Sequence, residues 1–209
     1  GGDRIVIPYG IAEVFRNFSP LAELPPRRAI FTSNPLRSLD WLLDLWQRDI
    51  YPHAPNAELH LFSGAVTYGS VGAAKAREME AILDKARGLK NQGVVLRGPV
   101  PKSELIEEFR KSRVMLYKGD LNETFCLAVG EAQAVGVPAV VQKLGSVVER
   151  VINGKTGAIT NTDREFASSA INLLNDDDLW RGQHKAAIEA QGVWGWSQAA
   201  QAFEELIPE

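Results

Sequence analysis

Short apolar runs alternate with longer segments of helical periodicity along most of this chain. The apolar runs, which predict buried strands, are 28–33, 58–63, 94–97, 114–117 and 137–141. The segments that follow them, which predict helices, are 39–47, 73–87, 102–110, 125–135 and 147–152. Such alternation is typical of strand–helix–strand units. It predicts an α/β fold with a Rossmann-like, mostly parallel sheet and helices on both faces.

The two ends of the chain depart from this alternation. The C-terminal part predicts one more strand and then a helical tail, at 158–160, 163–175, 178–189 and 197–207. At the N-terminus, residues 4–8 predict an extended piece, and residues 21–26 resemble a proline-containing linker. We therefore expect an interdomain segment at 1–20 and one Rossmann-like domain at 21–209.

Length and composition narrow the class of protein. The chain has 209 residues, of which 45% are hydrophobic, and this is enough for one well-buried core. Its formal net charge of −3 provides no basic surface, so we expect no nucleic-acid partner. The sequence contains no apolar run of about eighteen residues, and residues 1–4 lack the pattern of a secretory signal. We expect a cytoplasmic location.

Metal and thiol chemistry are not indicated. Cys126 is the single cysteine, and His53, His60 and His184 are scattered along the chain. An internal disulfide is therefore excluded, and no cluster has the spacing of metal ligands, so we expect no metal site. A helix N-terminus lowers the pKa of a thiol. No histidine lies near Cys126 in sequence, however, and we expect no catalytic thiol.

The segment 122–138 carries the strongest functional signal, because seven residues separate Glu123 from Glu131. If a helix begins near Thr124 or Phe125, the glutamates lie roughly 9–12 Å apart along it. The unpaired amides of the first turn lie between them and suit an anion such as a diphosphate. Two acids at this spacing more often form a solvated face. Small neighbouring residues favour burial of Glu131, which then pairs with a basic residue or binds a ligand.

Arg37 is the first choice for a phosphate-binding cation. It follows a predicted strand and precedes a predicted helix, at the edge where open α/β sheets bind ligands. A guanidinium stays charged and can hold two phosphate oxygens at once. The alternative is a solvent-facing arginine at the start of a helix. Lys118, which follows the fourth predicted strand, is either a second cation of the site or an exposed lysine.

The segment from Glu123 to Pro138 resembles the E-x-F-G-L-x-x-x-E-A-x-A-x-G-x-P signature of glycosyltransferase family 4, also called group 1. Four more segments resemble other elements of that family, in the same order along the chain: 7–11, 32–39, 96–101 and 148–157. The first is similar to the I-P-N-G-I-D element that begins the second domain, with Tyr9 for the Asn and Ala12 for the Asp. The resemblance implies the C-terminal, nucleotide-sugar-binding domain of a GT-B enzyme at 21–209.

The resemblance also implies roles for individual residues. Arg37 and Glu123 would be catalytic, Arg37 by stabilising the leaving diphosphate and Glu123 by orienting the sugar. The donor-binding set would be Arg37, Val100, Glu123, Phe125, Cys126, Leu127 and Glu131. Within it Glu131 would hold the ribose, and the backbone of Val100 would meet the base. A plain strand-to-helix turn would need the same residues around Val100, and we also expect Phe125 and Leu127 to pack the helix onto the sheet.

By this resemblance the chain is half of a retaining enzyme that transfers a sugar from a nucleotide-diphosphate donor to an acceptor. An N-terminal acceptor-binding domain would be its partner, and the isolated half would be inactive. No cofactor beyond the donor substrate is required, and peripheral membrane association of the full enzyme stays open.

Departures from the family pattern support an alternative hypothesis, namely Tyr9 and Ala12, given above, and two more. Thr32 stands where the family usually has a second basic residue, and Cys126 stands where it has glycine. A non-catalytic nucleotide-binding regulatory module is therefore the second hypothesis. A third, a response-regulator-like domain, would need acidic residues after the first strand, where the sequence has 32–34, Thr-Ser-Asn.

Overall fold

The computed structural model describes residues 4–64 and 74–207. Within them the chain forms a parallel sheet of six strands in the order β3-β2-β1-β4-β5-β6. The strands are β1 (Arg28–Phe31), β2 (Glu58–Leu61), β3 (Val94–Leu96), β4 (Val114–Tyr117), β5 (Ala139–Gln142) and β6 (Gly157–Thr160). This is the Rossmann order and not the flavodoxin-like order of response regulators. The predicted Rossmann-like sheet is confirmed.

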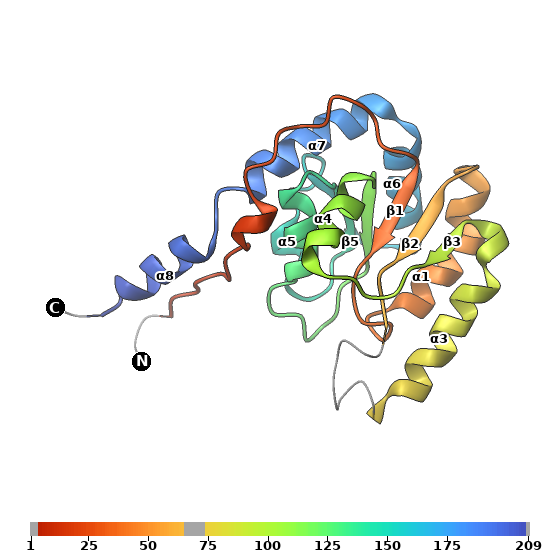
Figure 1. The fold of residues 1–209 in the computed structure, drawn as a ribbon, viewed down its shortest axis with the longest axis horizontal. Helices are drawn as coiled ribbons and strands as arrows, with labels where there is room; N and C mark the ends of the chain where they lie inside the picture. Colours follow the sequence, from red (N-terminus) through yellow and green to blue (C-terminus); the bar gives the residue numbers. More distant parts are fainter. Residues whose placement is uncertain (1–3, 65–73, 208–209) are drawn as a thin grey trace.

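Helices cover both faces of the sheet (Figure 1). They are α1 (Leu39–Leu45), α3 (Ala76–Gly88), α4 (Lys102–Arg110), α5 (Leu127–Ala134), α6 (Asp163–Asn175), α7 (Asp177–Gln191) and α8 (Trp196–Glu204). Helix α1 packs against α3, and the π-helical turn Trp46–Ile50 that continues α1 packs against α6, so these helices share one face. Helix α5 packs against β4, β5 and α7 on the other face.

The N-terminal segment and α8 lie beside each other, outside the layered body (Figure 1). The Ile11 N–H donates to the Trp194 carbonyl at 3.0 Å, and the Trp194 indole donates to the Pro8 carbonyl at 3.1 Å. Most exposed large apolar side chains of the described ranges lie within 5–14 and within 193–207, which includes α8: Ile5, Val6, Tyr9, Val14, Val193, Trp196, Phe203, Leu206 and Ile207. The helical C-terminal tail is confirmed, and residues 4–8, which were predicted to be extended, belong to neither a helix nor a sheet strand.

Several predicted boundaries are wrong, and left-handed backbone explains two of them. The helix predicted at 125–135 begins only at Leu127, because Cys126 has φ 59° and cannot continue a right-handed helix. In place of the helix predicted at 147–152 there is a 3₁₀ helix, Gly145–Arg150, whose first residue, Gly145, has φ 62°. Residues 1–3 and Ala73, which entered the predictions for the N-terminus and for α3, lie outside the described residues.

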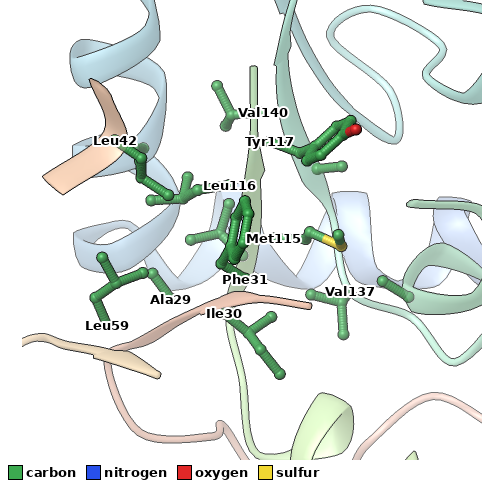
Figure 2. Packing of buried hydrophobic residues seen from close by; sticks show 14 of the residues in the cluster. Ala29, Ile30, Phe31, Leu42, Leu59, Met115, Leu116, Tyr117, Val137 and Val140 are labelled. Carbon is green, nitrogen blue, oxygen red and sulfur yellow. The ribbon is translucent and has the colours of Figure 1, made fainter. Parts of the chain in front are cut away.

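The core lies between the sheet and its helices, and the central strands are buried on both faces. Ala29, Ile30 and Phe31 of β1 and Met115 and Leu116 of β4 are almost fully shielded from solvent. Figure 2 shows how these side chains pack together. Continuous apolar runs are typical of parallel strands covered on both sides. The rigid layer places the loops after β1 and β4 at the same edge, where ligands bind in open α/β sheets.

The segment predicted as a linker is anchored to the domain. The guanidinium of Arg113 is buried and donates to the carbonyls of Pro25 and Leu174 and to Asp177. Because these partners belong to the segment 21–26 and to the ends of α6 and α7, one side chain connects three parts of the chain.

Candidate functional site

Arg37 and Glu123, which the sequence places far apart, meet at the C-terminal edge of the sheet. Arg37 lies in the turn before α1, and Glu123 lies in the loop between β4 and α5. The Arg37 Nη1 is 3.7 Å from Glu123 Oε2 and 3.1 Å from Asp120 Oδ1. The site therefore contains a cation between two carboxylates. Asp120 was missed by the sequence reasoning, although its place just after a buried strand is a usable signal.

A buried tyrosine holds the Glu123 carboxylate through a hydrogen bond. The Tyr117 hydroxyl donates to Glu123 Oε2 at 2.7 Å. Burial, and then this hydrogen bond, raise the pKa of Tyr117 well above its usual range, so the phenol remains a donor. The Glu123 N–H donates to the Asp120 carbonyl at 3.0 Å, which closes a turn. Glu123 is thus held as an oriented hydrogen-bond acceptor.

Free backbone amides lie next to this carboxylate, at the start of α5. The first helical hydrogen bond of α5 runs from the Gly130 N–H to the Cys126 carbonyl at 3.2 Å. The Leu127 and Ala128 N–H groups come before it and donate to no group in the described part of the chain. They can bind an anion where the helix dipole is positive. Phe125 and Cys126 lie before the helix rather than in its first turn.

Cys126 is a structural residue in this geometry. Its side chain is buried, and burial is the main cause that raises the pKa of its thiol to about 12. The thiol is therefore protonated at neutral pH and is not a nucleophile.

Aromatic side chains flank the same loop. The Phe125 ring is buried, with the Arg150 guanidinium 4.1 Å from its centre and the Tyr9 ring centre at 5.4 Å. Tyr9 in turn contacts Trp196, with ring centres 5.7 Å apart. A pocket of about 200 Å³ opens here, lined by Val6, Ile7, Pro8, Tyr9, Thr124, Phe125 and Glu149. Phe125, just before α5, thus contacts the N-terminal segment, and Tyr9 connects it to α8. Leu127 is half-buried and packs against the core.

A second pocket, of about 240 Å³, brings Val100 and Glu131 together. Its lining comes from the ends of β1 and β2, the loop after β3, and two helices: Thr32, Ser33, Phe62, Ser63, Gly64, Pro99, Val100, Lys102, Leu105 and Glu131. Glu131 is only 6% exposed and forms an ion pair with Lys102. Burial raises the pKa of Glu131, and the Lys102 ammonium opposes the shift. Glu131 is therefore paired and also lines a pocket. The sequence reasoning missed Lys102.

The two positions considered for a second cation differ from Arg37 in their surroundings. Lys118 Nζ lies 4.6 Å from the centre of the Trp41 ring, on the α1 side of the sheet. Thr32 lines the pocket of Val100 and Glu131, and within the described ranges its buried hydroxyl has no hydrogen-bond partner. Arg37 is the cation that contacts Glu123.

Residues 4–64 and 74–207 contain no group of His, Cys, Asp and Glu side chains placed to hold a metal ion. None of the helices in those ranges is long and apolar enough to cross a membrane.

Comparison with known sequences identifies relatives. The family model described as glycosyl transferases group 1 matches residues 28–176. The D-inositol 3-phosphate glycosyltransferase of Corynebacterium diphtheriae is 31% identical over 140 residues, which are 66% of this chain and 32% of that protein. The lipopolysaccharide 1,2-N-acetylglucosaminetransferase of Salmonella typhimurium is 25% identical over 144 residues, 67% of this chain and 37% of that protein. The chain thus matches about a third of these relatives' length.

Comparison with solved structures supports the fold. Sucrose-phosphate synthase from Thermosynechococcus elongatus superposes with a TM-score of 0.74 at 22% identity, over 99% of this chain and 52% of that one. The HepE protein of Anabaena, solved with UDP-glucose, superposes with a TM-score of 0.64 at 16% identity, over 87% of this chain and 49% of its own. At these identities the likeness establishes the Rossmann-like architecture.

Proposed function

Because the chain belongs to the group 1 glycosyl transferases, we propose that it is the donor-binding half of a retaining enzyme that transfers a sugar from a nucleotide-diphosphate sugar to an acceptor. Residues 21–209 would form the donor domain, and 1–20 the segment that leads to it. An acceptor-binding domain would be the partner across the cleft. A match to only a third of the relatives' length supports this division. The cytoplasm is the expected location.

The observation that carries the proposal is the contact of Arg37 with Glu123 beside the free amides of α5. Arg37 supplies a cation in contact with Glu123, and two N–H donors at the start of α5 follow Glu123 in the chain, a set of groups that suits a diphosphate linked to a sugar. The diphosphate would lie between Arg37 and the Leu127 and Ala128 amides. The sugar hydroxyls would then donate to Glu123, which Tyr117 holds in place.

The nucleoside would occupy the pocket that contains Val100 and Glu131. The Val100 backbone would meet an edge of the base, and Glu131 would accept hydrogen bonds from the ribose diol. The pocket belongs to the sheet edge that also carries Arg37, so one extended ligand can reach both. HepE was solved with UDP-glucose, and a donor of this chemical class fits the proposal.

The contribution of this half to catalysis would be electrostatic. As the bond from the sugar to the diphosphate breaks, negative charge grows on the leaving phosphate oxygens. Arg37 and the two amides would stabilise that charge in place, without reorganisation at the moment of reaction. The acceptor would attack from the face that the diphosphate leaves, which retains configuration without a protein nucleophile. Cation and dipole together can serve the diphosphate without a metal ion.

Titration calorimetry with UDP and GDP tests the proposal. Arg37→Ala should weaken binding by about 1.5–3 kcal/mol, the range for a hydrogen bond to a charged group. Arg87→Ala is the matched control, since Arg87 pairs with Glu80 and Asp84 on α3. Equal affinities of the wild-type chain and Arg37→Ala would refute the assignment.

The non-catalytic nucleotide-binding module is the second candidate. One observation favours it, namely that Arg37 alone faces two carboxylates while Thr32 occupies the second basic position of the family. Sugar transfer after the chain is joined to an acceptor domain separates the two functions. Binding without transfer in the complete protein would favour the regulatory module.

A further inference from the structure

The guanidinium of Arg37 is paired with the carboxylate of Asp120. The Asp120 Oδ1 lies 3.1 Å from Arg37 Nη1, closer than the 3.7 Å that separates this nitrogen from Glu123 Oε2. The contact is Coulombic, because Nη1 is shielded from solvent yet forms no hydrogen bond to any described residue. A phosphate oxygen with better alignment could supply the missing hydrogen bond.

Asp120 is placed there by a built turn. Its Oδ1 also accepts from the Asn122 N–H at 2.8 Å, and its carbonyl accepts from the Glu123 N–H at 3.0 Å. Gly145 packs so closely that a Cβ there would lie 2.1 Å from the Asp120 carbonyl oxygen. The Asp120 side chain is 29% exposed and is held against Arg37 by the loop that carries Glu123.

The charges of this cluster do not favour a diphosphate. Arg37 contributes one positive charge, and Asp120 and Glu123 contribute two negative charges. Glu123 has a task in the proposed function, since it would accept from the sugar. Asp120 has none, and its carboxylate repels any phosphate that approaches the same guanidinium.

We propose that Asp120 is an internal competitor for Arg37, which lowers the affinity of the site for nucleoside diphosphates. The inference rests on the proposed function, because it takes Arg37 as the phosphate ligand. When the diphosphate binds, Arg37 exchanges the carboxylate for a phosphate oxygen, and Asp120 turns to solvent. Asp120 thus sets how tightly donor and leaving diphosphate are held, and it keeps the free guanidinium oriented.

Asp120→Asn is a close test of this role. Asparagine keeps the side-chain oxygen that accepts from Asn122 and removes the charge that competes for Arg37. Titration calorimetry with UDP and GDP, in EDTA and at low salt, should show binding tightened by about tenfold, as expected when a like charge is removed near the ligand. Uridine and guanosine, which lack phosphate, should bind the variant and the wild-type chain equally.

Two further variants isolate the contact. Asp84→Asn removes one carboxylate from α3, where Asp84 pairs with Arg87, and should leave affinity unchanged. In a chain that carries Arg37→Ala, adding Asp120→Asn should raise the logarithm of the affinity by at most half as much as it does in the wild-type chain. The group for which Asp120 competes is then absent.

The outcomes separate this inference from the proposed function. If Arg37→Ala weakens diphosphate binding but Asp120→Asn leaves it unchanged or weaker, Asp120 is no competitor and the proposed function stands. An equal gain in Asp84→Asn would attribute the effect to net charge and also overturn the inference. If the wild-type chain binds neither diphosphate, the proposed function and this inference fail together.

Discussion

Glu131 is a buried carboxylate whose ion-pair partner is largely exposed. The Glu131 side chain is 8% exposed and that of Lys102 is 58% exposed. A buried carboxylate without a partner is costly, and Lys102 supplies one while leaving Glu131 at the wall of a pocket. The pair therefore stabilises the free site and can still admit ribose hydroxyls.

Glu131→Gln should weaken binding of UDP or GDP by about 1–3 kcal/mol, because an amide accepts more weakly than a carboxylate. The loss should be smaller with 2′,3′-dideoxy analogues, which lack the diol. Calorimetry measures both affinities, and Glu189→Gln, an exposed acid of α7 paired with Lys185, is the control. Equal losses with ribose and dideoxyribose ligands would rule out a ribose contact.

Cys126 should be chemically inert in the folded chain. Its thiol is buried and its pKa is about 12, so the reactive thiolate is scarce at pH 8. Alkylation by iodoacetamide at pH 8 should be about a hundredfold slower in the native chain than in urea. Mass spectrometry of timed samples measures the rates, and rapid native labelling would show that Cys126 is accessible.

At the scale of elements, Gly145 lets the 3₁₀ helix Gly145–Arg150 approach the loop that carries Asp120 and Glu123. Its φ of 62° favours glycine, and a Cβ would collide with the Asp120 carbonyl. The Ser146 N–H donates to the Glu123 carbonyl at 3.4 Å from the same turn. The conformation of the site loop therefore depends on one glycine outside it.

Gly145→Ala should lower the free energy of unfolding by about 1–3 kcal/mol through backbone strain and this collision. Diphosphate binding should weaken as well, since the loop must shift. Gly182→Ala is the control, because a Cβ at Gly182 in α7 meets no atom within 4 Å. That change should stabilise the chain by about 0.5–1 kcal/mol through helix propensity. Urea titrations give both values, and similar effects of the two changes would contradict the account.

Sequence patterns predicted the elements where local signals were strong. The segments 102–110 and 163–175 match α4 and α6, and α6 also has a clear cap in Thr162, which accepts from the Glu165 N–H. The start of α5 was predicted too early because nothing in the local pattern signals the left-handed Cys126. Arg37 and Glu123 were both proposed as site residues from the sequence, and the fold brings them into contact. Asp120 and Lys102 were not proposed, because their partners Arg37 and Glu131 are distant in the sequence and meet them only in the fold.

At the scale of the whole molecule, His184 ties distant segments together. The Leu21 N–H donates to His184 Nε2 at 2.8 Å, so Nδ1 carries the proton and donates to the Gly136 carbonyl. The ring stacks on Trp180, with centres 4.5 Å apart. Burial lowers the pKa of His184, and that of His60 in the same way. The neutral form is the one that the fold holds.

The chain should consequently lose stability in mild acid. The unfolded chain binds protons to histidine near pH 6.5, whereas the folded chain binds them only at lower pH. The contribution of the neutral histidines to the free energy of unfolding is therefore complete above pH 6.5. It falls as pH drops below that value, by up to about 1.4 kcal/mol per pH unit for each histidine. Urea titrations from pH 7.5 to 5 measure this slope. His60→Gln should remove part of it, and an unchanged slope in that variant would contradict the role of burial at His60.

The chain by itself should bind donor but transfer no sugar. Catalysis needs the acceptor held against the donor in a closed site, an effect that can contribute roughly 7–11 kcal/mol to rate enhancement. A donor-binding domain alone would lose most of this contribution. Radiolabelled UDP-glucose and GDP-mannose with a panel of acceptors should give no product with the 209-residue chain. Product above the level of the Arg37→Ala control would show that a complete site exists within it.

A crystal structure of the chain with UDP or GDP would test the central claim most directly. The account predicts a diphosphate bound by Arg37 and by the Leu127 and Ala128 amides, with the ribose at Glu131 and the base at the Val100 backbone. Arg37 should have exchanged Asp120 for phosphate. A nucleotide bound elsewhere, or one that leaves the edge of β1 and β4 empty, would contradict the assignment of this chain as a donor-binding domain.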